Sequence, residues 1–341
     1  MYVTTKSREV RLASRPAGFP EPENFELAEV DLGEPGPGEV LVRNTVMSVE
    51  PYMRGRMNDA KSYVPPFAIG APLEGAVVGF VVASKDESLP AGTWVQSMFG
   101  WREYTVAKAK SFQKIDTSLA PASAYLGVLG VPGLTAWAGL KIVGELKSSD
   151  VVFVSSAAGA VGSIAGQIAK LAGATVIGSA GGADKVAYLK EKLGFDAAFD
   201  HQGGKIAEKL AHAAPDGIDL YFDNVGGEQL EAAIGALRTY GRVAACGMIA
   251  GYNEAVPGPR NMTLVVGKRL RIQGFIVIDY FSRIGEFLAE VAPQLRSGKI
   301  VAPETYFEGI ASAPEAFDKL MRGGAHVGKI LVRLAPEGTR P

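Results

Sequence analysis

A run of small residues stands between a strand pattern and a helix pattern in the middle of the chain. Val151–Val154 is apolar and mostly β-branched, as in a strand buried on both faces, and apolar positions recur at helical spacing over 161–168. Between them, Ala157, Gly159 and Gly162 follow an A-x-G-x-x-G spacing. Small side chains let a pyrophosphate approach the backbone, and the N–H groups of the helix start point toward it. The spacing predicts a dinucleotide site, with an ordinary tight turn as the alternative.

The residues about twenty positions beyond these glycines indicate which dinucleotide is bound. In NAD-binding units, an acidic residue at this point accepts hydrogen bonds from the adenosine ribose. Here Gly181 and Gly182 lie at the strand end, and Lys185 follows in the first turn of the next predicted helix. A phosphate on the ribose would be held by this lysine and by the two glycine N–H groups. The sequence favours NADP over NAD, and a solvated surface cation is the alternative interpretation of Lys185.

Three further segments follow predicted strands, and ligands of open α/β sheets bind beyond the carboxyl ends of the strands. These segments are Asn224, then Cys246, Gly247 and Met248, and then Phe275, Ile276 and Val277. Each has a structural alternative: a turn amide that bonds its own backbone, a small buried thiol, and a plain core strand. If 275–277 form an apolar strand at the edge of the sheet, that edge would be exposed and prone to pairing with another chain. A second subunit would cover it. We therefore expect a homodimer.

The chemistry available to such a site depends on its titratable residues. Tyr252 lies in a glycine-flanked loop after a predicted strand, where its O–H can stabilise charge developing on a substrate oxygen. The alternative is an ordinary loop aromatic. The chain has one cysteine, Cys246, and three histidines, His201, His212 and His326. These are too few, and too far from the N-terminal region, for the Cys and His ligands of a zinc dehydrogenase. We therefore expect no catalytic metal.

The 341 residues divide into two predicted domains that differ in their pattern of strands and helices. Residues 1–125 show short strands separated by Gly- and Pro-rich turns, which predicts a partly open β-barrel. Within them, 53–66 lacks periodicity and is interpreted as a mobile loop over the pocket. Residues 126–300 alternate strands with helical patterns, which predicts an α/β doubly wound parallel sheet. Residues 301–341 become strand-like again and are expected to complete the barrel.

Composition excludes several classes of function. A formal net charge of -1 leaves no basic footprint for nucleic acid or anionic lipid. A single cysteine excludes an internal disulfide framework. The uncharged run 117–140 is long enough to span a bilayer, but prolines and glycines interrupt it. The N-terminal residues have no apolar core of the signal-peptide type. We expect a cytoplasmic protein that acts on a small molecule, without nucleic acid or membrane partners.

Several longer motifs resemble those of one known family. They are VEPYMR at 49–54, GVPGLTAWAGL at 130–140, SAAGAVGSIAGQIAKLAGATVIGSAGG at 156–182, KVAYLKEKLGFDAAFDH at 185–201, YFDNVGGE at 221–228, CGMIAGYN at 246–253 and GFIV at 274–277. With them, the chain resembles the medium-chain dehydrogenase/reductase superfamily over nearly its whole length. It is most similar to the zinc-independent leukotriene B4 dehydrogenase/prostaglandin reductase branch, with bacterial curcumin reductase and plant double-bond reductases. The resemblance implies a GroES-like barrel domain joined to a Rossmann NADP-binding domain.

The resemblance also implies an activity and roles for residues. The activity is NADPH-dependent reduction of the C=C bond of α,β-unsaturated ketones and aldehydes, with hydride going to the β-carbon. The implied cofactor contacts are the turn Ala157, Gly159, Ala160, Val161 and Gly162 on the pyrophosphate, Lys185 on the 2′-phosphate, Asn224, Cys246, Gly247 and Met248 beside the cofactor, and Phe275, Ile276 and Val277 along the nicotinamide. Tyr252 matches a tyrosine proposed as proton donor or carbonyl partner, and Tyr52 matches a second tyrosine on the substrate side.

Two positions depart from the family pattern. His201 stands where a tyrosine is usual near the adenosine phosphate, and His326 stands where an asparagine is frequent near the cofactor. Both imidazoles can donate hydrogen bonds, so binding can survive the change. Two other functions remain as alternatives: a quinone reductase of the same superfamily, and a non-catalytic NADPH-binding protein.

Overall fold

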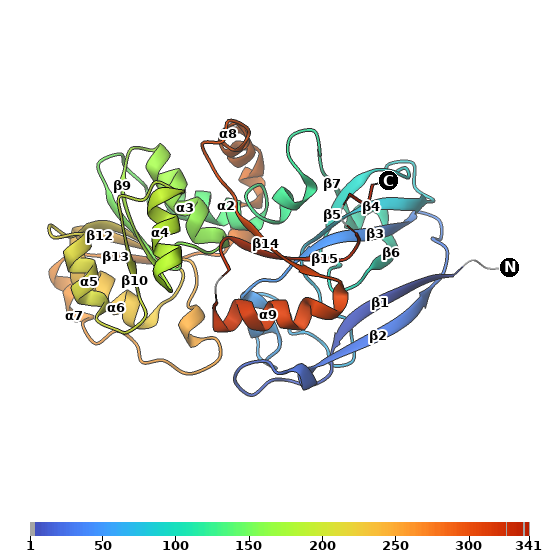
Figure 1. The fold of residues 1–341 in the computed structure, drawn as a ribbon, viewed down its shortest axis with the longest axis horizontal. Coiled ribbons are helices and arrows are strands. Elements are labelled where there is room, and N and C mark those ends of the chain that lie inside the picture. The colour runs from blue at the N-terminus through green and yellow to red at the C-terminus, as the bar shows by residue number, and fades with distance from the viewer. Residues whose placement is uncertain (1–3, 325, 337, 341) are drawn as a thin grey trace. The chain divides into compact units, whose positions relative to one another are not determined.

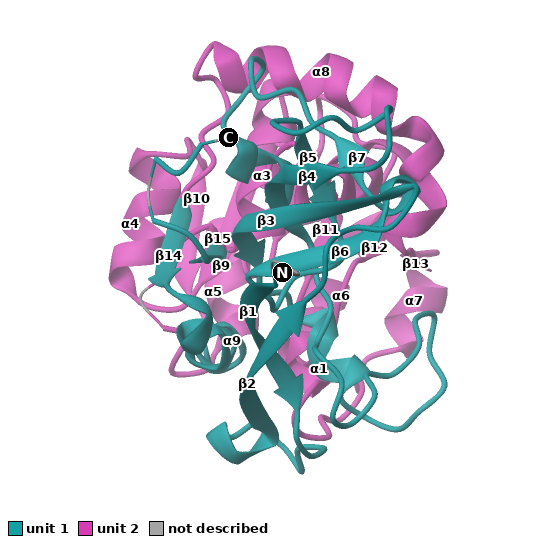
Figure 2. Ribbon diagram, turned by 90° about the vertical axis from the view of Figure 1, so that its right-hand side faces the viewer, with its two compact units in different colours: residues 1–126, 304–323, 330–341 teal, residues 127–303, 324–329 magenta. Residues whose placement is uncertain are grey.

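The computed structural model describes residues 4–324, 326–336 and 338–340, and these form two compact units (Figures 1 and 2). The first unit comprises 1–126, 304–323 and 330–341, and the second comprises 127–303 and 324–329. The C-terminal part of the chain therefore contributes to both units. Each unit is described by itself below.

The second unit is built on six parallel strands in the order β10-β9-β8-β11-β12-β13. The strands are β8 (Val151–Val154), β9 (Thr175–Ala180), β10 (Ala197–Asp200), β11 (Ile218–Asp223), β12 (Leu237–Ala245) and β13 (Arg271–Gly274). The chain starts in the middle of the sheet, runs to one edge, and then returns to build the other half. This is the doubly wound order, which reverses between β8 and β11. The predicted fold class is confirmed.

Helices cover both faces of this sheet. They are α2 (Val131–Ala138), α3 (Ala160–Leu171), α4 (Ala183–Glu191), α5 (Ile206–Ala213), α6 (Gly227–Ala236), α7 (Thr263–Gly267) and α8 (Ile284–Arg296). Tyr221 and Phe222 are successive residues of β11 and so point to opposite faces, yet both are fully buried. The ring of Phe222 lies against Gly139, just after α2, where a Cβ would be 2.5 Å from it.

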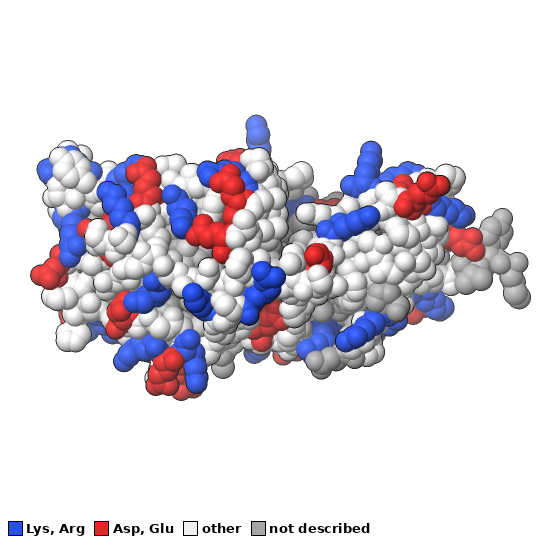
Figure 3. Space-filling view, turned by 90° about the horizontal axis from the view of Figure 1, so that it is seen from above, with Lys and Arg blue, Asp and Glu red and all other residues white. Residues whose placement is uncertain are grey.

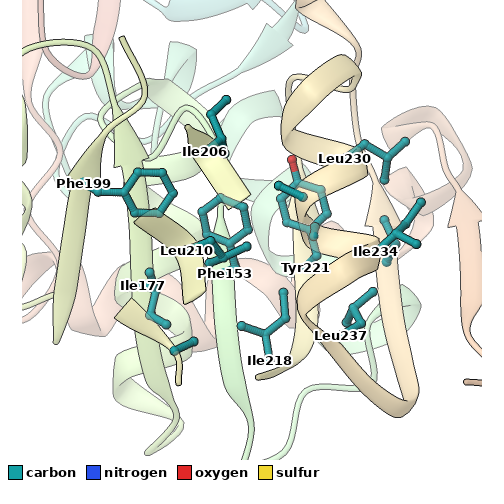
Figure 4. Close-up of a cluster of buried hydrophobic side chains, with 14 residues drawn as sticks. Phe153, Ile177, Phe199, Ile206, Leu210, Ile218, Tyr221, Leu230, Ile234 and Leu237 are labelled. Atoms are coloured by element: carbon teal, nitrogen blue, oxygen red, sulfur yellow. The ribbon is translucent and has the colours of Figure 1, made fainter. Parts of the chain in front are cut away.

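On the other face, stacked aromatic rings form the centre of the core (Figure 4). The ring of Phe153 on β8 lies 4.9 Å from that of Tyr221 and 5.7 Å from that of Phe199, measured between centroids. Leu210 from α5 and Ile234 from α6 pack against the same cluster. Full burial of an apolar side chain of this size contributes roughly 1.5–3 kcal/mol. This core fixes β8 and β11, whose carboxyl ends carry the candidate site.

The first unit contains a seven-stranded sheet in the order β14-β15-β3-β4-β5-β7, with β6 also paired to β3, and a separate ribbon of β1 with β2. Its strands are β1 (Thr5–Leu12), β2 (Phe25–Leu32), β3 (Glu39–Ser48), β4 (Val77–Ser84), β5 (Trp94–Ser97), β6 (Tyr104–Lys108), β7 (Gln113–Lys114), β14 (Glu304–Glu308) and β15 (Lys329–Arg333). Its helices are α1 (Tyr52–Arg56) and α9 (Ala313–Arg322). The pairing of β15 with β3 is antiparallel, so the C-terminal strand extends a sheet formed by the N-terminal region.

The structure corrects two predictions about local structure and adds one strand that was not predicted. The segment 53–66, predicted as a loop, begins inside helix α1. The core-strand alternative for 275–277 requires strand β13 to reach Val277, but the strand ends at Gly274 and 277–283 form a 3₁₀ helix. Strand β1 was not predicted, since its charged residues hide the alternation; it pairs with β2 over all eight residues.

The surface agrees with the mixed composition. Lys and Arg side chains are interspersed with Asp and Glu over the face shown in Figure 3. Across 4–324, 326–336 and 338–340, no helix combines the length and the apolar character that a membrane crossing requires.

Candidate functional site

The turn between β8 and α3 is held by backbone hydrogen bonds, one within the turn and one to strand β9. The N–H of Ala157 donates to the Ser179 carbonyl at 2.9 Å, and the N–H of Gly159 donates to the Ser156 carbonyl at 2.9 Å. A Cβ at Gly162 would lie 2.3 Å from the Ser156 carbonyl oxygen. Only glycine therefore lets α3 approach the turn so closely. Ser156 itself has φ +48°, the left-handed region, which marks the sharpness of the bend.

The first N–H groups of α3 are open to a ligand. The helix begins at Ala160, and its N-cap residue, Gly159, has no side chain to cap it. The N–H groups of Ala160 and Val161 consequently have no acceptor among the described residues. Together with the positive end of the helix dipole, these donors suit a phosphate group.

A segment from near the C-terminus closes against this turn. The N–H of Gly328 donates to the Ala158 carbonyl at 2.7 Å, and Gly328 forms an isolated bridge with Gly159. Gly328 has φ +74°, and a Cβ there would lie 1.9 Å from the Pro303 carbonyl oxygen. No residue but glycine fits, so the position of this segment is fixed. Sequence reasoning missed this contact, because it joins residues far apart in the chain.

Lys185, in the first turn of α4, is half-buried, and no carboxylate among the described residues stabilises its charge. Burial alone lowers the pKa of its ammonium group. Two imidazoles feel this charge. Burial, and then the charge of Lys185, lower the pKa of His326 to about 4. Burial also lowers the pKa of His201, against the opposing effect of Asp200, and its Nδ1 is buried without a partner in the described chain.

The glycines beside this lysine differ in what they offer. The N–H of Gly182, predicted to hold a phosphate, instead donates to Asp200 Oδ1 at 2.9 Å. The same oxygen accepts the N–H of Gln202 at 2.9 Å. Asp200 ends the neighbouring strand β10, so its carboxylate reaches this N–H at the shared edge of the sheet. The N–H of Gly181 has no acceptor among the residues described and is still available.

Asn224, directly after β11, is fixed by the end of the neighbouring strand β8. Its N–H donates to Ser155 Oγ at 2.9 Å, and its Nδ2 donates to the Ser155 carbonyl at 2.7 Å. The turn residue that bonds its own backbone, the alternative from the sequence, is therefore not what the structure shows. Ser155 is fully buried at the point where the strand order reverses. The sequence analysis passed over Ser155, although a polar residue straight after an apolar strand was a usable signal.

Asp223, the last residue of β11, organises the same turn. Its Oδ1 accepts hydrogen bonds from the Tyr221 hydroxyl at 2.7 Å and from the N–H groups of Val225 at 2.9 Å and Gly226 at 2.8 Å. Its Oδ2 is buried without a partner in the part of the chain described. Burial raises the pKa of Asp223. This carboxyl was also missed from the sequence, and it positions the backbone that carries Asn224.

A pocket of about 510 Å³ opens beyond β12 and β13. It is lined by Ala245, Cys246, Gly247, Met248, Tyr252, Gly274, Phe275, Ile276 and Asp279. The Tyr252 hydroxyl oxygen lies beside Gly247, 3.4 Å from where a Cβ of that residue would be. Burial of the thiol, and then the charge of Asp223, raise the pKa of Cys246 to about 12. The thiol is therefore protonated at neutral pH and lines the pocket as a small apolar group.

Two of the three residues of the segment 275–277 line this pocket. Phe275 packs edge-on against Phe222 and Tyr280, with ring centroids 6.3 Å and 6.2 Å away. Phe275 and Ile276 line the pocket, whereas Val277 begins the 3₁₀ helix and does not. The core-strand alternative is wrong, because the chain leaves the sheet at Gly274.

Tyr52 belongs to the first unit, at the start of α1. Its hydroxyl is buried and lacks a hydrogen-bond partner among the described residues, and burial raises its pKa. Arg56 anchors the chain that follows. Its guanidinium lies 4.0 Å from the centroid of the Phe67 ring, and its Nε donates to the Pro65 carbonyl at 2.9 Å. The segment predicted as a mobile loop is thus tied back to α1.

The titratable side chains do not gather as metal ligands would. Within the described ranges, no three His, Cys, Asp or Glu side chains are grouped so that they could hold a metal ion. The second unit instead contains the turn between β8 and α3, Lys185 with its two neighbouring imidazoles, and the pocket lined by Tyr252. His212 is exposed on α5. The fold and this site define a dinucleotide-binding protein of the doubly wound class.

Comparison with known proteins identifies the family. Residues 8–115 match a family described as the N-terminal domain of oxidoreductase, and residues 160–292 match one described as zinc-binding dehydrogenase. The NADPH-dependent curcumin reductase of Escherichia coli is 42% identical over 337 residues, 97% of each chain. The NADP(+)-dependent 2-alkenal reductase of Nicotiana tabacum is 40% identical over 344 residues, covering 99% of this chain and 100% of the relative.

A solved structure leads to the same family. CurA from Vibrio vulnificus, crystallised in complex with NADPH, is 41% identical and superposes with a TM-score of 0.91, covering 96% of this chain and 99% of that one. The chain therefore belongs to the medium-chain dehydrogenase/reductase family, in the branch of NADP-dependent reductases that contains these relatives.

Proposed function

We propose that the protein uses NADPH to reduce the C=C bond of α,β-unsaturated ketones and aldehydes, in the cytoplasm, where NADPH is regenerated. The observation that carries the proposal is Lys185, a half-buried cation without a counter-ion at the position where NADP and NAD differ. Relatives named curcumin reductase, 2-alkenal reductase and (+)-pulegone reductase support the choice of substrate class.

The residues present fit this cofactor. The uncapped start of α3 offers N–H groups to a pyrophosphate, and Gly159 and Gly162 keep side chains away from it. A 2′-phosphate would supply the anion that Lys185 lacks. Asn224 and 246–248 follow β11 and β12, on the side of the sheet where the nicotinamide end is expected.

The chemistry divides between the cofactor and the pocket. Bound NADPH supplies the hydride, which the β-carbon of the enone accepts. Negative charge then develops on the carbonyl oxygen, and we assign its stabilisation to the hydroxyl of Tyr252, a residue of the pocket lining beside Gly247. The same hydroxyl, or water, protonates the α-carbon. Phe275 and Ile276 give the pocket apolar walls. Tyr52 is proposed as a second substrate-side tyrosine.

The direct test is NADPH oxidation with an enone, a quinone and a saturated ketone supplied in parallel. We expect turnover with the enone, and with deuterium at C4 of NADPH we expect the label at the β-carbon of the saturated product, read by NMR. Consumption with the quinone alone would indicate a quinone reductase. No turnover with any acceptor, together with normal NADPH binding, would indicate a non-catalytic binding protein.

We also infer that the protein is a homodimer joined through β13. This strand ends its sheet, and its outer edge has no partner among the residues described. Ile272 on the strand is 37% exposed, and Val266 on the preceding helix α7 is 81% exposed. Light scattering after gel filtration should give twice the mass of the 35.8 kDa chain. Ile272→Asp should lower that mass to the monomer, whereas Leu27→Asp on the exposed face of the first unit should not; a monomeric native protein would refute the inference.

A further inference from the structure

Two histidines share the surroundings of Lys185, and nothing in the proposed reaction uses their protons. His201 follows β10; its N–H donates to the Ala180 carbonyl at 3.0 Å, and its Cε1 lies 3.3 Å from where a Cβ of Gly181 would be. His326 lies in the segment that Gly328 fixes against the phosphate turn. Both rings are partly buried, and both are close enough to Lys185 to feel its charge.

The charges facing this pair are predominantly positive. His201 faces Asp200 beside it, Lys185 from α4 and Lys209 from α5, and His326 faces Lys185. The Asp200 carboxylate is already occupied by backbone N–H groups, and Lys209 Nζ donates to the Asp200 carbonyl at 2.8 Å. Two lysines thus face the pair against the single carboxylate of Asp200, and without a further anion both rings are neutral at pH 7.

We propose that binding of NADP⁺ by this protein takes up a proton on the His201–His326 pair, so that an imidazolium joins Lys185 in recognising the 2′-phosphate. The proposal rests on the proposed function, because it needs the phosphorylated cofactor at this position. The physical cause is a change in the sign of the local potential: the phosphate offsets Lys185 and favours the charged form of each ring.

The direction of the pH dependence of NADP⁺ affinity distinguishes recognition by an imidazolium together with Lys185 from recognition by Lys185 alone. If the free protein binds fewer protons than the complex, linkage requires the affinity for NADP⁺ to rise as the pH falls from 8 toward 6. A phosphate has a second pKa of about 6 and loses charge over the same range. With only Lys185 to recognise it, the affinity would fall as the pH is lowered, and binding would release protons.

The experiment is isothermal titration calorimetry of NADP⁺ and of NAD⁺, at pH 8, 7 and 6, in pairs of buffers with different ionisation enthalpies. For the native protein we expect net proton uptake with NADP⁺, an affinity about 3–10-fold tighter at pH 6 than at pH 8, and little change for NAD⁺. In the double variant His201→Gln/His326→Gln, uptake should vanish or become release, and the affinity should weaken toward pH 6. Gln keeps a hydrogen-bonding group but cannot be charged.

The control is His212→Gln, which changes the third histidine, exposed on α5, and should behave as the native protein does. Circular dichroism of each variant confirms folding before titration, and the two single variants divide the effect between the rings. The same proton count in the native protein and the double variant would overturn the inference, and so would equal uptake with NAD⁺. Failure of NADP⁺ to bind at any pH would instead remove the proposed function.

Discussion

Lys185→Gln is the most direct perturbation of cofactor choice. The native ammonium group is half-buried in the first turn of α4 and has no carboxylate partner in the described chain. A charge-assisted hydrogen bond to a phosphate is worth roughly 1.5–3 kcal/mol. Partial burial reduces screening by solvent, so we expect the upper part of this range. The loss of NADPH affinity should therefore be about 30–150-fold, whereas NADH, which has no 2′-phosphate, should bind nearly as before.

Fluorescence titration with both cofactors measures this difference, and Lys190→Gln is the matched control. Lys190 lies on the same helix but is exposed. Without cofactor, Lys185→Gln should melt at or slightly above the native temperature, because burying an unpaired ammonium group costs stability. Equal losses for NADPH and NADH, or a loss for NADPH below threefold, would refute the assignment of Lys185 to the phosphate.

Three further predictions concern the pH dependence, the turn and the pocket. Below pH 6.5 the unfolded chain binds more protons than the folded one at His326, whose pKa is about 4 in the fold, so stability should fall as the pH drops from 6.5 to 4. After discounting for partial exposure, His326→Gln should remove about 1–2 kcal/mol of this loss, as measured by thermal melts at each pH. An equal loss of stability in the native protein and the variant between pH 6.5 and 4 would contradict the prediction. Gly159→Val should abolish NADPH binding with stability within about 1 kcal/mol of native, whereas Gly162→Ala should unfold at a clearly lower temperature, because its Cβ meets the Ser156 carbonyl at 2.3 Å. Tyr252→Phe should lower kcat for an enone with little change in NADPH affinity, and unchanged kcat would exclude its hydroxyl from the reaction.

The parts of the site predicted from sequence are those whose causes are local. The spacing of Ala157, Gly159 and Gly162 predicts a turn because strand, small residues and helix follow one another directly, and the structure has that turn. The missing acid before Lys185 is also a local feature. The partner of Gly182 is not local: Asp200 reaches it only because β9 and β10 pair. The contact between Gly328 and the turn likewise depends on tertiary packing.

The polar network at the ends of β8 and β11 shows where a stronger inference from sequence was possible. Ser155 and Asn224 are far apart in the chain, and they bond because these two strands are neighbours in the sheet. The doubly wound order places the first and fourth strands side by side, and the connections leave them toward opposite faces. Once that order is predicted, the residues that follow these two strands must meet. The same reasoning extends to Asp223, the last residue of β11. Its carboxylate accepts the N–H groups of Val225 and Gly226 and so holds the turn that follows this strand.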